Sequence, residues 1–109
     1  MDTKTINTTK DNENDAKRVI VLNTPIDFEG TTYNEIDLSG LDELTGKDIK
    51  FISKQYRRLG GSAMTKELDI EYLQLVAAKA TGLPVEFFDE LKAKDSTTVE
   101  VIVRNFLIL

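Results

Sequence analysis

VIVLNTPIDFEGTTYNEIDL, residues 19–38, is the stretch that determines how the fold begins. Its first four residues are apolar and mostly β-branched, as in a strand. Thr24-Pro25 interrupts this run, and Ile26 and Phe28 then alternate with polar residues as far as Glu29-Gly30, a turn signal. Because β-prone residues resume at Thr31, we predict a β-hairpin with its turn at Glu29-Gly30.

The second strand of this hairpin contains a break in its apolar alternation. Ile36 and Leu38 share one phase, and Tyr33 has the other. Successive side chains of a strand point to opposite faces, so only an irregularity can put all three on one face. We therefore predict a bulge near Asn34 or Glu35. A two-stranded hairpin is marginal alone, so its apolar face should pack on helices.

Downstream of the hairpin, apolar residues recur at helical spacing in four segments. Cap and stop signals mark their ends, with a Thr45 cap first and Gly60-Gly61 after the first segment. The first predicted helix runs from about Gly46 to Leu59, and the second, closed by Gly82, carries Leu68, Tyr72, Leu75, Val76 and Lys79. A short third helix follows Pro84 and carries Phe87, Phe88 and Leu91. The last helix is capped by Asp95 or Ser96, and its apolar positions are Val99, Ile102, Val103, Phe106 and Leu107.

The expected fold class is therefore α+β, mainly α, with an N-terminal β-hairpin followed by about four helices in one small domain. Residues 1–16 are polar except for Ile6 and have no helical or strand period, so we predict a flexible polar tail there. Residues 17–109 form the single domain, with the hairpin and a connector at 17–44 and the helical body at 45–109.

The composition argues against an enzyme. The chain of 109 residues has neither Cys nor His, which removes thiolate nucleophiles, Ser-His and Cys-His arrangements, the commonest general base and the commonest transition-metal ligand. We expect no catalytic residue, no cofactor and no metal. Without a signal peptide or a long apolar run, we expect a cytoplasmic protein that does not enter a membrane. The net charge of -5 opposes binding to nucleic acid unless basic residues gather on one face.

The first predicted helix does gather basic residues. At about 100° per residue, the side opposite its apolar positions carries Lys47, Lys50, Lys54, Arg57 and Arg58. This basic face either docks an acidic partner or is simply the solvated side of an amphipathic helix. Residues 27–43 contain six acidic residues and no basic one, so head-to-tail association between copies is conceivable.

Two further patterns have weaker functional interpretations. Residues 77–88 resemble a helix-turn-helix, but the first turns of the would-be recognition helix carry Glu86, Asp89 and Glu90, which phosphates would repel. The spacing of these three carboxylates also suits a metal site, but without His or further oxygen ligands nearby we prefer the interpretation of an acidic, solvated helix start. We expect a packed helical corner at this position.

The C-terminal segment, residues 99–109, has apolar side chains at eight of its eleven positions. They surround too much of a helix to form one narrow stripe. The segment is either the central core helix of the domain or a core helix whose outer side also meets a partner. The candidate contact residues are Val103, Phe106, Leu107 and Leu109.

Several short motifs, in this order, resemble the phage tail assembly chaperones encoded just before the tape measure protein of long-tailed phages and prophages. They cover about residues 19–109. The motifs are Leu22-x-x-Pro25-Ile26, Phe28-Glu29-Gly30, Tyr33-x-Glu35-Ile36-x-Leu38, Leu44-Thr45-Gly46-Lys47-Asp48-Ile49 and Ala77-Ala78-Lys79-x-x-Gly82-Leu83-Pro84.

The resemblance implies a hairpin followed by a helical body, no catalysis, and binding to the helical tape measure protein in the host cytoplasm to keep it soluble until the tail tube polymerises. It also implies, as a further partner, a frameshifted longer form of the same chain. The uneven charge of the domain adds a homo-oligomer to the candidate partners. The polar tail has no counterpart in the family pattern. The alternatives are a helix-turn-helix DNA-binding regulator and a minor structural component of the tail, which gene neighbourhood and purified virions would distinguish.

Overall fold

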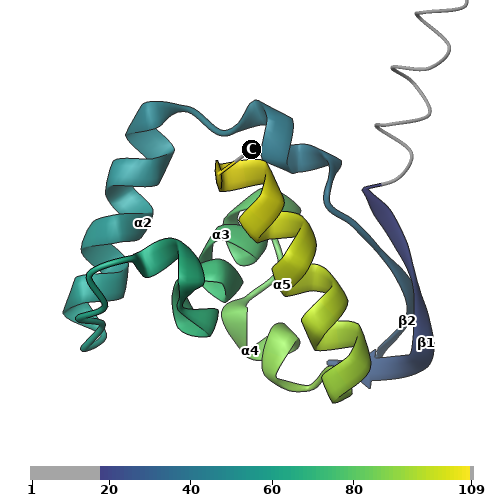
Figure 1. The fold of residues 1–109 in the computed structure, drawn as a ribbon. Helices are drawn as coiled ribbons and strands as arrows, with labels where there is room; N and C mark the ends of the chain where they lie inside the picture. The colour runs from purple at the N-terminus through teal and green to yellow at the C-terminus, as the bar shows by residue number, and fades with distance from the viewer. Residues whose placement is uncertain (1–17, 109) are drawn as a thin grey trace, which may run out of the picture.

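The structure, a computed structural model, describes residues 18–108. It has an N-terminal antiparallel hairpin and a helical body, as predicted (Figure 1). The predicted polar tail at residues 1–16 lies outside the described residues. The elements are β1 (Val19–Phe28), β2 (Thr31–Asp37), the 3-10 turn η1 (Ser39–Glu43), α2 (Gly46–Arg58), the 3-10 turn η2 (Lys66–Leu68), α3 (Ile70–Thr81), α4 (Val85–Asp89) and α5 (Ala93–Ile108).

The hairpin turn lies at Glu29-Gly30, as predicted. Phe28 pairs with Thr31, which leaves a two-residue loop. Both loop residues have positive φ, 49° for Glu29 and 83° for Gly30. A two-residue turn of this kind matches the right-handed twist of the strands, and glycine adopts such a φ without steric cost.

The predicted irregularity is present, but its extra residues lie on the other strand. Val21 pairs with Glu35 and Ile26 pairs with Tyr33, so four residues of β1 face the single residue Asn34. A single bulge therefore accounts for both the interruption at Thr24-Pro25 and the change of alternation on β2. It lets Ile36 and Tyr33 both contribute to the packing of the hairpin on the helices.

The backbone of this bulge is held by α5. The Asp95 carboxylate accepts hydrogen bonds from the N–H of Asn23 (2.9 Å), the side-chain amide of Asn23 (2.9 Å) and the N–H of Thr24 (3.1 Å). Asp95 was predicted as a helix cap, and that role was wrong. The helix already begins at Ala93, and the side chain turns toward the hairpin, where two strand N–H groups need acceptors.

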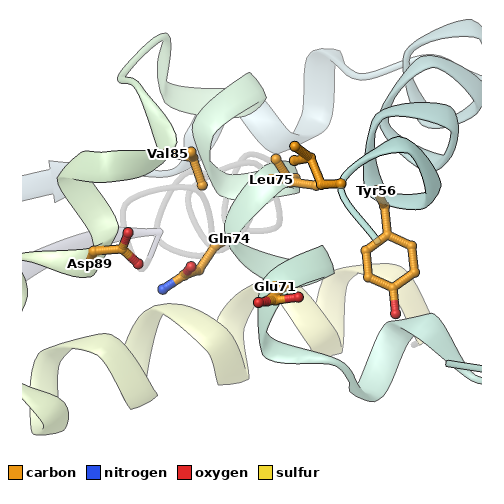
Figure 2. A pocket seen from close by; sticks show the side chains of 7 residues that line it. Tyr56, Glu71, Gln74, Leu75, Val85 and Asp89 are labelled. Atoms are coloured by element: carbon orange, nitrogen blue, oxygen red, sulfur yellow. The ribbon is translucent and has the colours of Figure 1, made fainter. Parts of the chain in front are cut away.

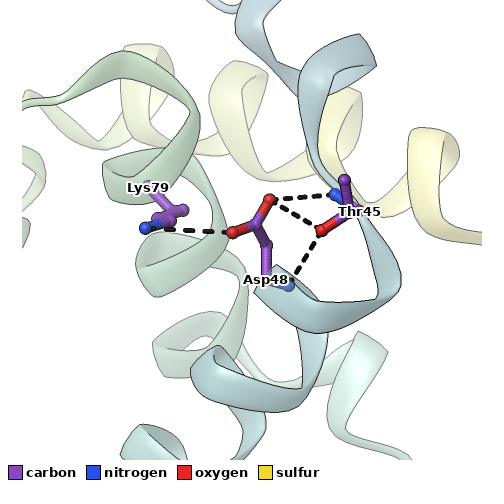
Figure 3. Close-up of polar contacts among 3 residues, drawn as sticks. All are labelled: Thr45, Asp48 and Lys79. Carbon is purple, nitrogen blue, oxygen red and sulfur yellow. Dashed lines mark hydrogen bonds and ion pairs between the residues drawn. The ribbon is translucent and has the colours of Figure 1, made fainter.

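The start of α2 is capped as the sequence indicated. The Thr45 hydroxyl accepts a hydrogen bond from the N–H of Asp48 (3.3 Å), and the Asp48 carboxylate accepts one from the N–H of Thr45 (2.9 Å) (Figure 3). The hydrogen bond from the Thr45 N–H holds the pKa of Asp48 below its usual value. Burial acts in the opposite direction, and the Thr45 hydroxyl and the positive charges of Lys79 and Lys47 add to the lowering. The Lys79 ammonium lies 4.0 Å from the same carboxylate and joins α2 to α3.

One hydrophobic core joins the hairpin to every helix, and α3 lies near its centre (Figure 1). Gly40 of η1 packs so closely on the backbone of Ala80 that an added Cβ would overlap the Ala80 carbonyl oxygen. Two residues assigned to inward faces were placed wrongly, since Leu59 is 68% exposed and Leu68 is 64% exposed. Leu59 follows the last residue of α2, and Leu68 lies in η2 before α3 starts, so neither follows the helical period.

Candidate partner-binding surface

The basic face of α2 is fully displayed. Ile52 and Tyr56 are the buried residues of this helix, and the five basic residues predicted to lie opposite them are all exposed: Lys47, Lys50, Lys54, Arg57 and Arg58. Phe51, which is 53% exposed, adjoins this face. The amphipathic pattern therefore located the basic residues, and their role in binding stays a prediction.

Exposed apolar residues that the sequence did not reveal follow α2 and lie close together in sequence. They are Leu59, Met64, Leu68 and Ile70, which we call the loop patch. Their side chains are 68%, 100%, 64% and 52% exposed. Among residues 18–108, four of the seven large apolar side chains that are mainly exposed thus fall within twelve consecutive residues. Exposed apolar side chains gathered in one segment suit contact with another protein.

The loop carrying this patch is fixed by Tyr56. Its hydroxyl donates a hydrogen bond to the Asp69 carboxylate (2.6 Å) and accepts one from the N–H of Ala63 (3.1 Å). The hydrogen bond to Asp69, followed by burial, raises the pKa of Tyr56 above 10.0. Asp69 also caps α3 by accepting from the N–H of Glu71 (2.9 Å). The loop that carries the patch is therefore fixed at Ala63 and Asp69 by the buried Tyr56 ring.

Next to the loop patch, a groove runs along α3 between α2 and α4. Its first part has a volume of about 180 Å³, and Figure 2 shows the side chains around it. A second part of about 360 Å³ shares Leu75 and Val85 with the first. We call the two parts together the α3 groove. The walls combine apolar and polar side chains, and the exposed carboxyl groups at its border belong to Glu71, Glu86 and Asp89.

The predicted contact residues of the C-terminal segment have different environments. Val103 is fully buried, so it belongs to the core and a partner cannot reach it while α5 stays in place. Phe106 and Leu107 are half-buried against the core, and the Arg18 guanidinium lies 5.0 Å from the centre of the Phe106 ring. Ile108 is 54% exposed. Leu109 lies outside the described residues.

The segment with the helix-turn-helix pattern forms a tight corner between α3 and α4. Gly82 ends α3 in a left-handed conformation, and α4 spans only five residues, with Phe87 and Phe88 buried. A helix of this length that exposes Glu86 and Asp89 is poorly suited to the major groove. Within residues 18–108, no group of three Asp or Glu side chains is arranged to hold a metal ion.

None of the helices within residues 18–108 is long and apolar enough to cross a membrane.

The family model described as "Phage tail assembly chaperone proteins, E, or 41 or 14" matches residues 19–108. A comparison with curated proteins and one with solved structures each gave no match.

Proposed function

The chain belongs to the phage tail assembly chaperone family, and on that premise we propose that it binds the helical tape measure protein and keeps it soluble before the tail tube polymerises. Binding would take place in the cytoplasm of the host cell. The role is one of protein binding, and we propose that the chain catalyses no reaction and uses no cofactor.

The observation that carries this proposal is the loop patch. A chaperone for a long helical client must cover apolar side chains that would otherwise aggregate. Leu59, Met64, Leu68 and Ile70 offer apolar contacts on a segment that Tyr56 and Asp69 hold in position. An amphipathic helix laid across them would bury its own apolar side chains.

The basic face of α2 supplies a second contact. It ends at Arg57 and Arg58, directly before Leu59 of the loop patch. Acidic residues beside the apolar stripe of a client helix would meet these guanidinium groups, which steers association and fixes orientation more than it adds affinity. The outer side of α5, at Phe106 and Leu107, is a third candidate contact. Further proposed partners are a second copy and a frameshifted longer form of the chain.

Co-expression with the tape measure protein tests the proposal. The variant Leu59→Ser/Leu68→Ser removes two exposed leucines, so we expect the soluble fraction of the client to fall several-fold. The control is Val21→Ser, because Val21 is an equally exposed apolar residue, at 74%, on the hairpin. Circular dichroism establishes that both variants are folded. An undiminished soluble fraction with folded Leu59→Ser/Leu68→Ser would overturn the role of the loop patch.

A further inference from the structure

We propose that the first part of the α3 groove holds one arginine side chain of the client, as the anchor of a client helix that also covers the loop patch. We call this part, which extends from Tyr56 of α2 to Asp89 of α4, the anchor pocket. The inference rests on the proposed function, because it names the side chain that the client contributes to the contact. It is carried by the chemistry of the pocket, which has one apolar and one acidic side.

The two sides of the anchor pocket are visible in Figure 2. Leu75 and Val85 lie along one side, and Glu71, Gln74 and Asp89 lie along the other. The volume of about 180 Å³ is below the roughly 300–1,000 Å³ of pockets that hold drug-sized ligands, so one long side chain is the better match. The aliphatic stem of an arginine would lie on the apolar side while its guanidinium reaches the acidic side.

The described lining of the anchor pocket carries negative charge. Its charged residues are Glu71 and Asp89, both exposed, and none of the described residues that line it is a Lys or Arg. Within residues 18–108, neither carboxylate forms an ion pair with a basic side chain. In this part of the chain, both carboxylates are therefore available to a cation that a partner supplies.

Arg57 lies beside the anchor pocket, but its guanidinium is already engaged. It lies 5.5 Å from the centre of the Tyr56 ring and donates a hydrogen bond to the Gly61 carbonyl oxygen (3.4 Å). Figure 2 shows Tyr56 and Asp89 at opposite ends of the pocket, so the Arg57 charge lies at the end away from Asp89.

The polar side of the pocket suits arginine better than lysine. A guanidinium directs several N–H donors in a planar fork, whereas an ammonium is a compact point charge. The half-buried Gln74 amide lies between Glu71 and Asp89 in Figure 2, so its oxygen adds a third acceptor to the same side. Arginine is also common among the residues that carry most of the binding energy of an interface.

Leu59 connects the anchor pocket to the loop patch. It is one of the four residues of that patch, and its side chain also lines the pocket. On a helix, residues about three or four positions apart share one face. A client helix that lays an apolar side chain on Leu59 would therefore bring a residue one turn away to the pocket. We expect that residue to be arginine.

Overlapping peptides that span the tape measure protein test the inference, with their affinity for the purified full chain measured by fluorescence anisotropy. In the peptide that binds most tightly, each arginine is replaced in turn by citrulline, which has nearly the same shape and no charge. The pocket variant is Glu71→Gln/Asp89→Asn. The matched control, Glu35→Gln/Glu43→Gln, removes two exposed carboxylates outside the pocket. Circular dichroism establishes that both variants are folded.

We expect one citrulline replacement to weaken binding to the wild-type chain and to the control at least about tenfold, because a charge-assisted contact is lost. The same replacement should change the affinity for the pocket variant little, since that variant lacks the two carboxylates. Equal losses with the wild-type chain and the pocket variant, or no arginine whose replacement matters, would overturn the inference and leave the proposed function standing.

Two further outcomes are distinguishable. N-acetylarginine methylamide is a probe that has the side chain without a helix, and an affinity equal to that of the peptide would assign the pocket to a small cation and overturn the inference. Failure of every peptide to bind the wild-type chain would contradict the proposed function and this inference together.

Discussion

At the scale of single residues, Asp95 has a structural role that the sequence did not predict, since its buried carboxylate binds the backbone of a distant strand. It is 1% exposed and lies 72 and 71 residues from its partners Asn23 and Thr24. A carboxylate at the start of a helix predicts a cap from local sequence alone. No local pattern indicates that a bulge elsewhere will supply the donors, which is why this contact could not be predicted.

We predict that Asp95→Asn lowers the free energy of unfolding by about 2–3 kcal/mol near neutral pH, because an amide NH₂ would face N–H donors. Burial alone would raise the pKa of Asp95, but the hydrogen bonds from Asn23 and Thr24 outweigh it and hold the pKa below 3.8. A lowered folded-state pKa gives stability that is present above 3.8 and is lost as pH falls through the folded value.

Urea denaturation of both proteins, near neutral pH and well below pH 3.8, checks this prediction. The difference in unfolding free energy between wild type and Asp95→Asn should shrink at the acidic pH. Equal stability near neutral pH would show that the carboxylate does not hold the bulge.

At the scale of elements, local signals predicted most of the fold. Glu29-Gly30 located the turn, and the Thr45 cap with Gly60-Gly61 located both ends of α2. These signals succeeded because turns and caps depend on residues close in sequence. The loop patch was missed because Leu59 and Leu68 were counted as members of helical periods that stop before them or start after them. The groove could not be predicted, since it depends on how α2, α3 and α4 pack together.

For α2, we predict that Thr45→Ala lowers the free energy of unfolding by about 1 kcal/mol, because the N–H of Asp48 loses its acceptor. Thr97→Ala is the control. Thr97 is exposed within α5, where alanine favours the helix slightly, so stability should stay the same or rise. Thermal denaturation followed by circular dichroism compares the two. An equal effect of both substitutions would contradict the role of the cap.

At the scale of the whole molecule, the proposed function depends on the side chains that the core does not bury. The hairpin and all helices share one core, yet the basic face of α2 and the loop patch are exposed side by side in sequence. A net charge of -5 keeps copies apart at long range, while the charge on α2 is concentrated and positive. This distribution suits a protein that receives a complementary helix at one edge.

Amide hydrogen exchange of the chain, with and without a soluble segment of the tape measure protein, tests the central claim most directly. The account predicts that the segment slows exchange in residues 59–70, the loop patch, and toward the end of α2, while the hairpin exchanges as before. Slowed exchange confined to the hairpin, or no change anywhere in the presence of the segment, would contradict it.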